Sequence, residues 1–130
     1  MLLQTTLCLA AAAAIINFWL SIRIGQLRHG LKISVGAGGN EQLERRMRAQ
    51  LNFAENVPII LILIGLVEAT GKAGAWLAPV GAVFMLGRVL HGLGMDGGKL
   101  GWGRMVGTLT ANLATVGLSV VALLIALGKM

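Results

Sequence analysis

Charged residues are scarce in this sequence. They make up 12% of its 130 residues, and hydrophobic residues make up 56%, whereas soluble domains have about 25% charged and about 45–50% apolar residues. This composition excludes an intrinsically disordered chain, because disorder requires low hydrophobicity and high net charge. The length is instead sufficient for about four membrane-spanning helices of ~20 residues each.

Cysteine and tyrosine are almost absent: the chain contains one cysteine, Cys8, and no tyrosine. A single cysteine excludes an intramolecular disulfide, and no spacing of cysteine and histidine is typical of zinc, so we expect no metal site. Nucleic-acid-binding modules place aromatic residues among solvated lysines and arginines. The three Phe and three Trp lie mostly in apolar runs. The net charge of +6 therefore does not indicate a nucleic acid, and we expect none as a partner.

Four apolar segments predict an all-α integral membrane protein that forms a four-helix bundle. The expected spans cover about residues 2–24, 48–69, 75–94 and 105–127 of a single domain, 1–130. The purely apolar run of the second segment, Val57–Val67, has only 11 residues, which is too short for a hydrocarbon core of about 30 Å. Its helix has to extend back through Arg48, Asn52 and Glu55, or these residues lie at the membrane boundary. Asn40 is predicted to cap the start of this helix.

The cations are unevenly distributed among the connections between these spans. Nine of the eleven lie before the second span or around the third connection, namely Arg23, Arg28, Lys32, Arg45, Arg46, Arg48, Arg88, Lys99 and Arg104. By the positive-inside rule, the first and third connections are predicted to be cytoplasmic and both termini to lie outside the inner membrane. Lys32, Arg45 and Arg46 are interpreted mainly as a cytoplasmic anchor.

With this topology, polar residues of several helices lie at one level of the membrane. At 100° per residue, Arg48, Asn52 and Glu55 lie within about 60° of one another on the second helix. The other helices add Arg28, Arg88, His91 and Arg104 to this level. An ionisable group at a helix centre costs about 2.5–3.5 kcal/mol on insertion scales, so such groups usually face a bundle interior or a wet cavity.

Two interpretations of this polar level remain open. In the structural one, Arg48 forms a contact inside the bundle with Glu55 or Arg88 that only orients the helices. In the functional one, several arginines and one glutamate form a pocket for a small molecule with carboxylates and one ammonium. The surplus of cations favours the pocket, because helix packing needs only one paired charge.

The second helix carries a motif similar to that of a known membrane family. The segment Glu44–Pro58 has the spacing E-R-x-x-R-A-x-x-N-x-x-E followed by a proline. It resembles the signature of the MAPEG superfamily, the membrane-associated proteins of eicosanoid and glutathione metabolism. The segment Arg88–His91 resembles the family's third-helix motif, and Gly25–Arg28 resembles the end of its first helix. The chain departs from the family pattern at Met95, where a tyrosine is common.

The resemblance implies a MAPEG-like homotrimer with glutathione, a co-substrate, bound between neighbouring protomers. Carried over residue by residue, it makes Arg104 the catalytic residue, and the glutathione-binding residues are Arg28, Arg48, Gln50, Asn52, Glu55 and His91. A second layer would consist of Arg45, Arg88 and Met95. Glu55 would face the ammonium of glutathione, the arginines would face its carboxylates, and Arg104 would stabilise its thiolate.

The function implied by the resemblance is that of a bacterial-type membrane glutathione transferase or peroxidase with a role in detoxification. Its thiolate would attack a hydrophobic electrophile or a lipid hydroperoxide, and its other partners are membrane lipids. An alternative is a non-catalytic, lipid-binding member that resembles the lipoxygenase-activating protein. A small four-helix multidrug exporter is disfavoured, because it needs a glutamate in its first helix and residues 2–22 contain no acid.

Overall fold

The computed structural model describes residues 2–97 and 101–130, and within these ranges it contains helices and no strand. The helices are α1 (Gln4–Leu31), α2 (Glu41–Ala69), α3 (Leu77–Gly94) and α4 (Trp102–Ala126), with a 3-10 helix, η1 (Met95–Gly97), directly after α3. The four long helices have the length and apolar composition needed to cross a membrane. The all-α, four-helix architecture expected from the sequence is therefore confirmed.

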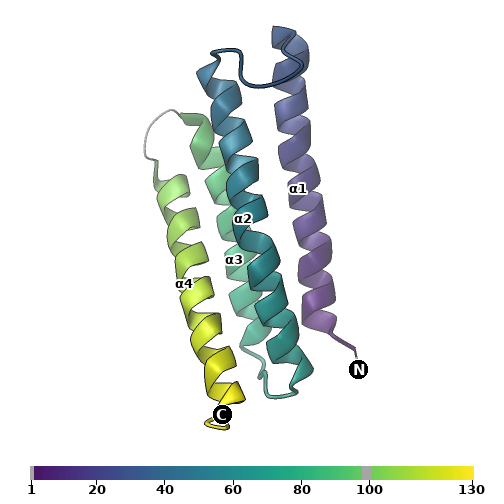
Figure 1. Ribbon diagram of the computed structural model, residues 1–130, viewed down its shortest axis with the longest axis vertical. Helices are drawn as coiled ribbons and strands as arrows, with labels where there is room; N and C mark the ends of the chain where they lie inside the picture. Colours follow the sequence, from purple (N-terminus) through teal and green to yellow (C-terminus); the bar gives the residue numbers. More distant parts are fainter. Residues whose placement is uncertain (1, 98–100) are drawn as a thin grey trace.

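Consecutive helices run in opposite directions, and α2 and α3 lie between α1 and α4 (Figure 1). The α1–α2 connection and the end of α3 lie at one end of the bundle, called the upper end after its place in Figure 1. The α2–α3 turn and both termini lie at the lower end. Met1 and the residues from Gly98 to Leu100, which include Lys99 of the cation count, lie outside the described residues.

The first two helices extend beyond their apolar spans at the upper end. α1 continues to Leu31, and α2 already begins at Glu41. The predicted cap is confirmed, because Asn40 Oδ1 accepts a hydrogen bond from the backbone N–H of Leu43 at 2.9 Å. This bond satisfies one of the free N–H groups of the first helical turn. The charged residues at this end of α2 are consequently placed by a regular helix and not by a loop.

A carboxylate of α2 caps the other end of α1. Glu68 accepts hydrogen bonds from the backbone N–H groups of Thr5 and Thr6, both at 2.8 Å, and from the Thr6 hydroxyl at 2.6 Å. The residue at the N-cap of α1, Leu3, provides no side-chain cap of its own. An acid is favourable at a helix N-terminus, where N–H groups are free and the helix dipole is positive. Glu68 thus fixes α1 to α2 at the lower end.

Glycines allow α3 and α4 to pack closely. A Cβ atom at Gly107 would lie 2.6 Å from the carbonyl oxygen of Gly87, and one at Gly103 would lie 2.8 Å from that of Leu90. Both distances are too short for any side chain, so the two backbones are in direct contact. Small residues serve this purpose at helix interfaces in membranes. The contact places the first turn of α4 against the end of α3.

Candidate functional site

A polar hollow of about 320 Å³ lies between α2, α3 and α4. The residues that line it are Arg48, Leu51, Asn52, Glu55, His91, Met95, Arg104 and Thr108. The structure therefore brings together most of the candidate site residues, which come from three helices and η1. Their common level in the membrane was expected from the topology, and the packing of the bundle brings them to one hollow.

The α2 wall of the polar hollow has charged side chains at its rim. Arg48 and Glu55 are exposed and Asn52 is partly buried. Within the described ranges, neither Arg48 nor Glu55 forms an ion pair. The structural interpretation, in which Arg48 contacts Glu55 or Arg88 only to orient the helices, is not supported by this part of the chain, where Arg88 donates instead to Asn52 and Gly107. Both charges face open space, where a ligand can meet them.

Arg88 is buried behind the polar hollow, with 2% of its surface exposed. Its guanidinium donates hydrogen bonds to Oδ1 of Asn52 and to the carbonyl oxygen of Gly107, and it lies 5.5 Å from the centre of the Phe84 ring. Its Nε has no partner among the described residues. Because these acceptors are neutral, the charge of Arg88 adds to the positive potential of the hollow.

Another wall of the polar hollow consists of His91 on α3 and Met95 in η1, both of which are buried. Met95 also lines a neighbouring hollow of about 230 Å³, whose other residues are Glu41, Glu44, Arg45, Arg48 and Arg104. In this second hollow, Arg45 forms an ion pair with Glu41 one turn away on α2. Arg45 thus lies beside the polar hollow without lining it.

Arg104 lies in the first turn of α4 and is partly exposed. The first turn of a helix has free N–H groups and a partial positive charge, both of which favour an anion. Arg104 also borders an apolar hollow of about 520 Å³ on α4, together with Met105, Val106, Thr108, Leu109 and Asn112. One guanidinium therefore lies where a polar and an apolar hollow meet.

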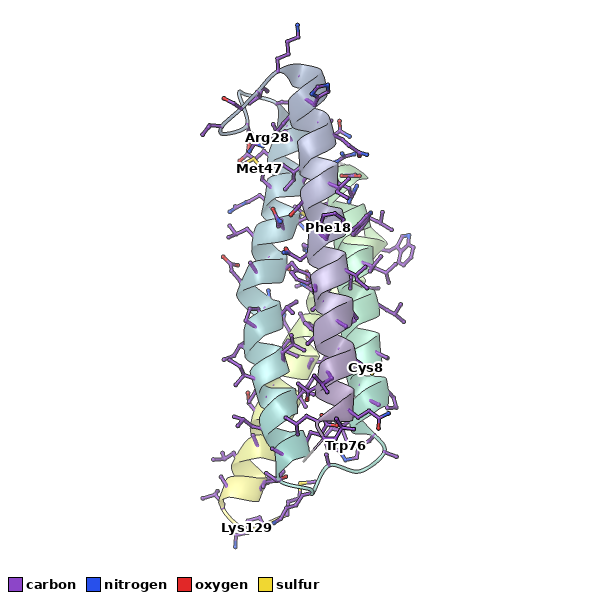
Figure 2. The ribbon with its side chains drawn as sticks, turned by 90° about the vertical axis from the view of Figure 1, so that its right-hand side faces the viewer. Cys8, Phe18, Arg28, Met47, Trp76 and Lys129 are labelled. Atoms are coloured by element: carbon purple, nitrogen blue, oxygen red, sulfur yellow. The ribbon has the colours of Figure 1, made fainter. Side chains whose placement is uncertain are left out.

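Two of the candidate residues, Arg28 and Gln50, lie outside the polar hollow. Gln50 is about 160° away from Asn52 around α2, and it donates a hydrogen bond to Ser21 Oγ of α1 at 2.6 Å. Arg28 donates to a backbone carbonyl of the α1–α2 connection at 2.7 Å and to the sulfur of Met47 at 3.4 Å; Figure 2 shows these two side chains next to each other. Arg28 and Gln50 both border a separate hollow of about 660 Å³.

The hollow of Arg28 and Gln50 is bounded by α1 and α2, and it shares only Arg48 and Leu51 with the polar hollow. The candidate residues thus form two groups on different faces of α2. A single chain does not enclose both groups in one site.

Asp96 forms a charged network with α1 and α2 that sequence reasoning missed. It pairs with Arg23 and with Arg46, the latter at 3.3 Å. Arg46, interpreted above mainly as a cytoplasmic anchor, thus also joins helices, because its guanidinium donates to the backbone carbonyl of Arg23 at 2.7 Å as well. Arg23 is buried and lies 4.8 Å from the centre of the Trp19 ring. The available signal was an acid in the connection between the third and fourth spans, where the sequence has no other acid.

The described residues contain no group of three or more His, Cys, Asp or Glu side chains placed to hold a metal ion. Cys8 is exposed on the lower part of α1 (Figure 2). The polar hollow therefore offers cations and hydrogen-bond donors but no thiol.

Comparisons with known proteins cover most of the chain. The family model of the MAPEG family matches residues 6–124. Inner membrane protein YecN of Escherichia coli strain K12 is 28% identical over 96 residues, which are 73% of this chain and 72% of that protein. YecN of Escherichia coli O6:H1 matches with the same identity and coverage.

Proposed function

The chain belongs to the MAPEG family, and from this premise we propose that it is a membrane glutathione transferase or peroxidase. The proposal is that it binds glutathione and activates the thiol as a thiolate for attack on a hydrophobic molecule. The observation that carries the proposal is the polar hollow, in which α2, α3 and α4 bring Arg48, Glu55 and Arg104 together.

The charges of the polar hollow are complementary to glutathione, which has two carboxylates, one ammonium and one thiol. Glu55 is the acid among the lining residues and would pair with the ammonium. Arg48 and Arg104, with the buried Arg88 behind them, would attract the carboxylates and the thiolate, since charge-assisted hydrogen bonds are the strong ones. The volume of about 320 Å³ lies within the range of about 300–1,000 Å³ that small-molecule sites have.

Arg104 would act on the thiol by its charge. Arginine stays protonated at neutral pH, so it does not serve as a general base. A nearby cation lowers the pKa of a thiol from about 8.5 toward the physiological range, and the proton is lost to water. The thiolate sulfur then forms a bond to an electrophilic carbon, and the leaving group departs with its electron pair. With a lipid hydroperoxide, the thiolate sulfur attacks the terminal oxygen, the O–O bond breaks, and the lipid alkoxide leaves with the electron pair and takes up a proton from water. The resulting sulfenic acid of glutathione then condenses with a second glutathione to give the disulfide and water.

The apolar hollow beside Arg104 supports a hydrophobic second substrate. Met105, Val106 and Leu109 line it, and all three are exposed on a helix that is long enough to span the membrane. A molecule dissolved in the lipid would reach this face of α4 directly. Its reactive atom would then meet the thiolate at Arg104, where the two hollows join.

The division of the candidate residues between two hollows supports a closed assembly of identical protomers, and the order of three in the proposed homotrimer comes from the family resemblance. A ring of identical subunits uses heterologous interfaces, in which two different faces of the chain meet. The face with Arg28 and Gln50 on one protomer could then lie against the polar hollow of the next. Glutathione bound between protomers would contact both groups.

The proposed location is the inner membrane, as the name of the similar protein YecN states for that protein. The positive-inside rule places the upper end of the bundle in the cytoplasm. The two termini and the α2–α3 turn would then lie on the other side. The polar hollow would open near the cytoplasmic surface, where a soluble thiol is available.

Titration of detergent-purified protein with glutathione in a calorimeter tests the binding step, and an aryl halide tests turnover. We expect saturable binding and formation of the thioether, and both should weaken in Glu55→Gln. Binding of lipid without turnover would support the non-catalytic alternative. Absence of glutathione binding to the wild-type protein would contradict the proposal.

A further inference from the structure

Asp96 connects three helices next to the polar hollow. One of its oxygens, Oδ2, accepts a hydrogen bond from the guanidinium of Arg23, and the other, Oδ1, accepts one from Nε of Arg46 at 3.3 Å. Arg23 also donates to the backbone carbonyl of Gly92 at 3.0 Å. The end of α3 is therefore fastened to α1 and α2 by charged groups.

The burial of this network makes the negative charge of Asp96 important for holding the end of α3 in place. The side chains of Arg23 and Arg46 are only 10% and 16% exposed, and that of Asp96 is 26% exposed. Removing one partner of a buried charge pair leaves the other charge uncompensated, which is strongly unfavourable. Without the charge of Asp96, two neighbouring guanidinium groups would repel each other, and only the hydrogen bond from Arg23 to Gly92 would be left of this attachment of the α3 end.

The end of α3 in turn determines where α4 begins. A Cβ atom at Gly94 would lie 2.9 Å from the carbonyl carbon of Gly103 and 3.2 Å from the Cα of Arg104. The backbones of α3 and α4 are thus in direct contact at this point, one residue before Met95. Because Met95 and Arg104 both line the polar hollow, a shift of the α3 end changes that hollow.

We propose that Asp96 is a positioning residue, which holds the end of α3 through Arg23 and Arg46 and thereby places Arg104 at the polar hollow. Asp96 is not among the residues that line the hollow, so it acts through Arg104 and not on the ligand. The effect of Asp96 on catalysis rests on the proposed function. The effect of Asp96 on the position of α4 can be measured without glutathione.

The structural part of the proposal is tested by the distance between two spin labels. Cysteines replace Phe18 on α1 and Met105 on α4, which are 66% and 56% exposed, in a Cys8→Ser background diluted with unlabelled chains. We expect Asp96→Asn to shift or broaden the distance distribution, and Asp96→Glu to restore it partly. If Asp96→Asn does not fold, Arg46→Gln removes one of the two pairs and carries the same expectation.

A matched control comes from the same end of the molecule. Glu41→Gln breaks the ion pair with Arg45, in which the glutamate side chain is 77% exposed, and exposed pairs contribute little. This variant should leave the distribution unchanged. If the distance distribution of Asp96→Asn is the same as that of the wild type, the proposal is overturned. Where Asp96→Asn does not fold, the same comparison is made with Arg46→Gln.

The catalytic part is tested by a double-mutant cycle on the pKa of the bound glutathione thiol. Asp96→Asn should raise this pKa, and the double variant with Arg104→Ala should match Arg104→Ala alone, because both changes act through the same guanidinium. If the pKa shifts of the two single variants add in full in the double variant, the proposal that Asp96 acts through Arg104 is overturned. If the wild-type protein binds no glutathione, the proposed function is contradicted and the spin-label distances alone decide the role of Asp96.

Discussion

The guanidinium of Arg88 donates a hydrogen bond to Oδ1 of Asn52 from a buried position behind the polar hollow. A side-chain amide has an acceptor oxygen and two donors on nitrogen. Because Arg88 uses the oxygen of Asn52, under the proposed function the Nδ2 donors would be available to glutathione in the hollow. A carboxylate is an acceptor that suits these donors, so under the proposed function this pair of residues would link the packing of the bundle to the binding of glutathione.

Asn52→Asp separates the two roles of this residue. The new carboxylate keeps an acceptor for Arg88, so the midpoint of thermal unfolding should stay the same or rise. The variant loses the Nδ2 donors and adds a negative charge, so the affinity for glutathione should fall about 10- to 100-fold, since a hydrogen bond to a charged group contributes about 1.5–3 kcal/mol. Calorimetry and thermal unfolding measure both effects. Unchanged affinity would show that Asn52 serves packing alone.

Glu55→Gln should weaken glutathione binding without affecting the fold. The substitution keeps the shape of the side chain but removes the charge expected to face an ammonium, so the dissociation constant should rise about 10- to 100-fold. Glu68→Gln is the matched control on the same helix. It weakens the cap of α1 at the lower end, so it should lower thermal stability and leave the dissociation constant unchanged. Equal effects of the two variants on binding would argue against a ligand contact by Glu55.

Gly107→Ala should destabilise the bundle, because its Cβ would lie 2.6 Å from the carbonyl oxygen of Gly87 and 3.0 Å from the Cα of His91. Overpacking of this kind costs about 1–3 kcal/mol. Gly117→Ala on the same helix is the control, since nothing lies within 4 Å of its Cβ and alanine is the better helix former by about 0.8–1.0 kcal/mol. In unfolding experiments in detergent, Gly107→Ala should therefore be less stable than the wild type, and Gly117→Ala should be as stable as the wild type or more stable. The reverse order would contradict the close contact of α3 and α4.

Cysteine labelling tests which side of the membrane each connection faces. Val35 is 84% exposed in the α1–α2 connection, and it is a better site than Gly38, whose backbone φ of +56° and contact with Ile33 disfavour a side chain. In a Cys8→Ser background, Val35→Cys should react with an impermeant thiol reagent only in opened cells. Lys72→Cys in the α2–α3 turn should react in intact cells. The opposite labelling pattern would contradict the predicted topology and indicate the reverse orientation.

Much of the fold follows from local sequence features. The four apolar segments indicate four helices, and the capping chemistry of Asn40 identifies the start of α2. The periodicity of 3.6 residues per turn places Arg48, Asn52 and Glu55 on one stripe, and the structure shows them along one hollow. The same periodicity separates Gln50 from Asn52, so the division between two faces of α2 was already present in the sequence.

The interactions that local features could not predict join residues far apart in the chain. Glu68 caps α1 by accepting from Thr5 and Thr6, which lie 63 and 62 positions earlier in the chain. Asp96 pairs with Arg23 across 73 positions. No local pattern specifies such partners, because they depend on the order in which the helices pack and on the offset between neighbouring helices. The contact of Arg88 with Asn52 is of the same kind.

Arg104 is the residue on which the proposed chemistry depends, and the thiolate that it would stabilise can be observed directly. The ultraviolet absorbance of the thiolate is titrated against pH in the complex with glutathione, for the wild type and for Arg104→Ala, with Lys72→Ala as a control that removes a charge at the lower end. We expect the wild-type complex and the control to form thiolate at neutral pH. Arg104→Ala should raise the pKa of the bound thiol by about one unit or more, where one unit corresponds to about 1.4 kcal/mol. Identical titration curves for the wild type and Arg104→Ala would contradict thiolate activation by Arg104.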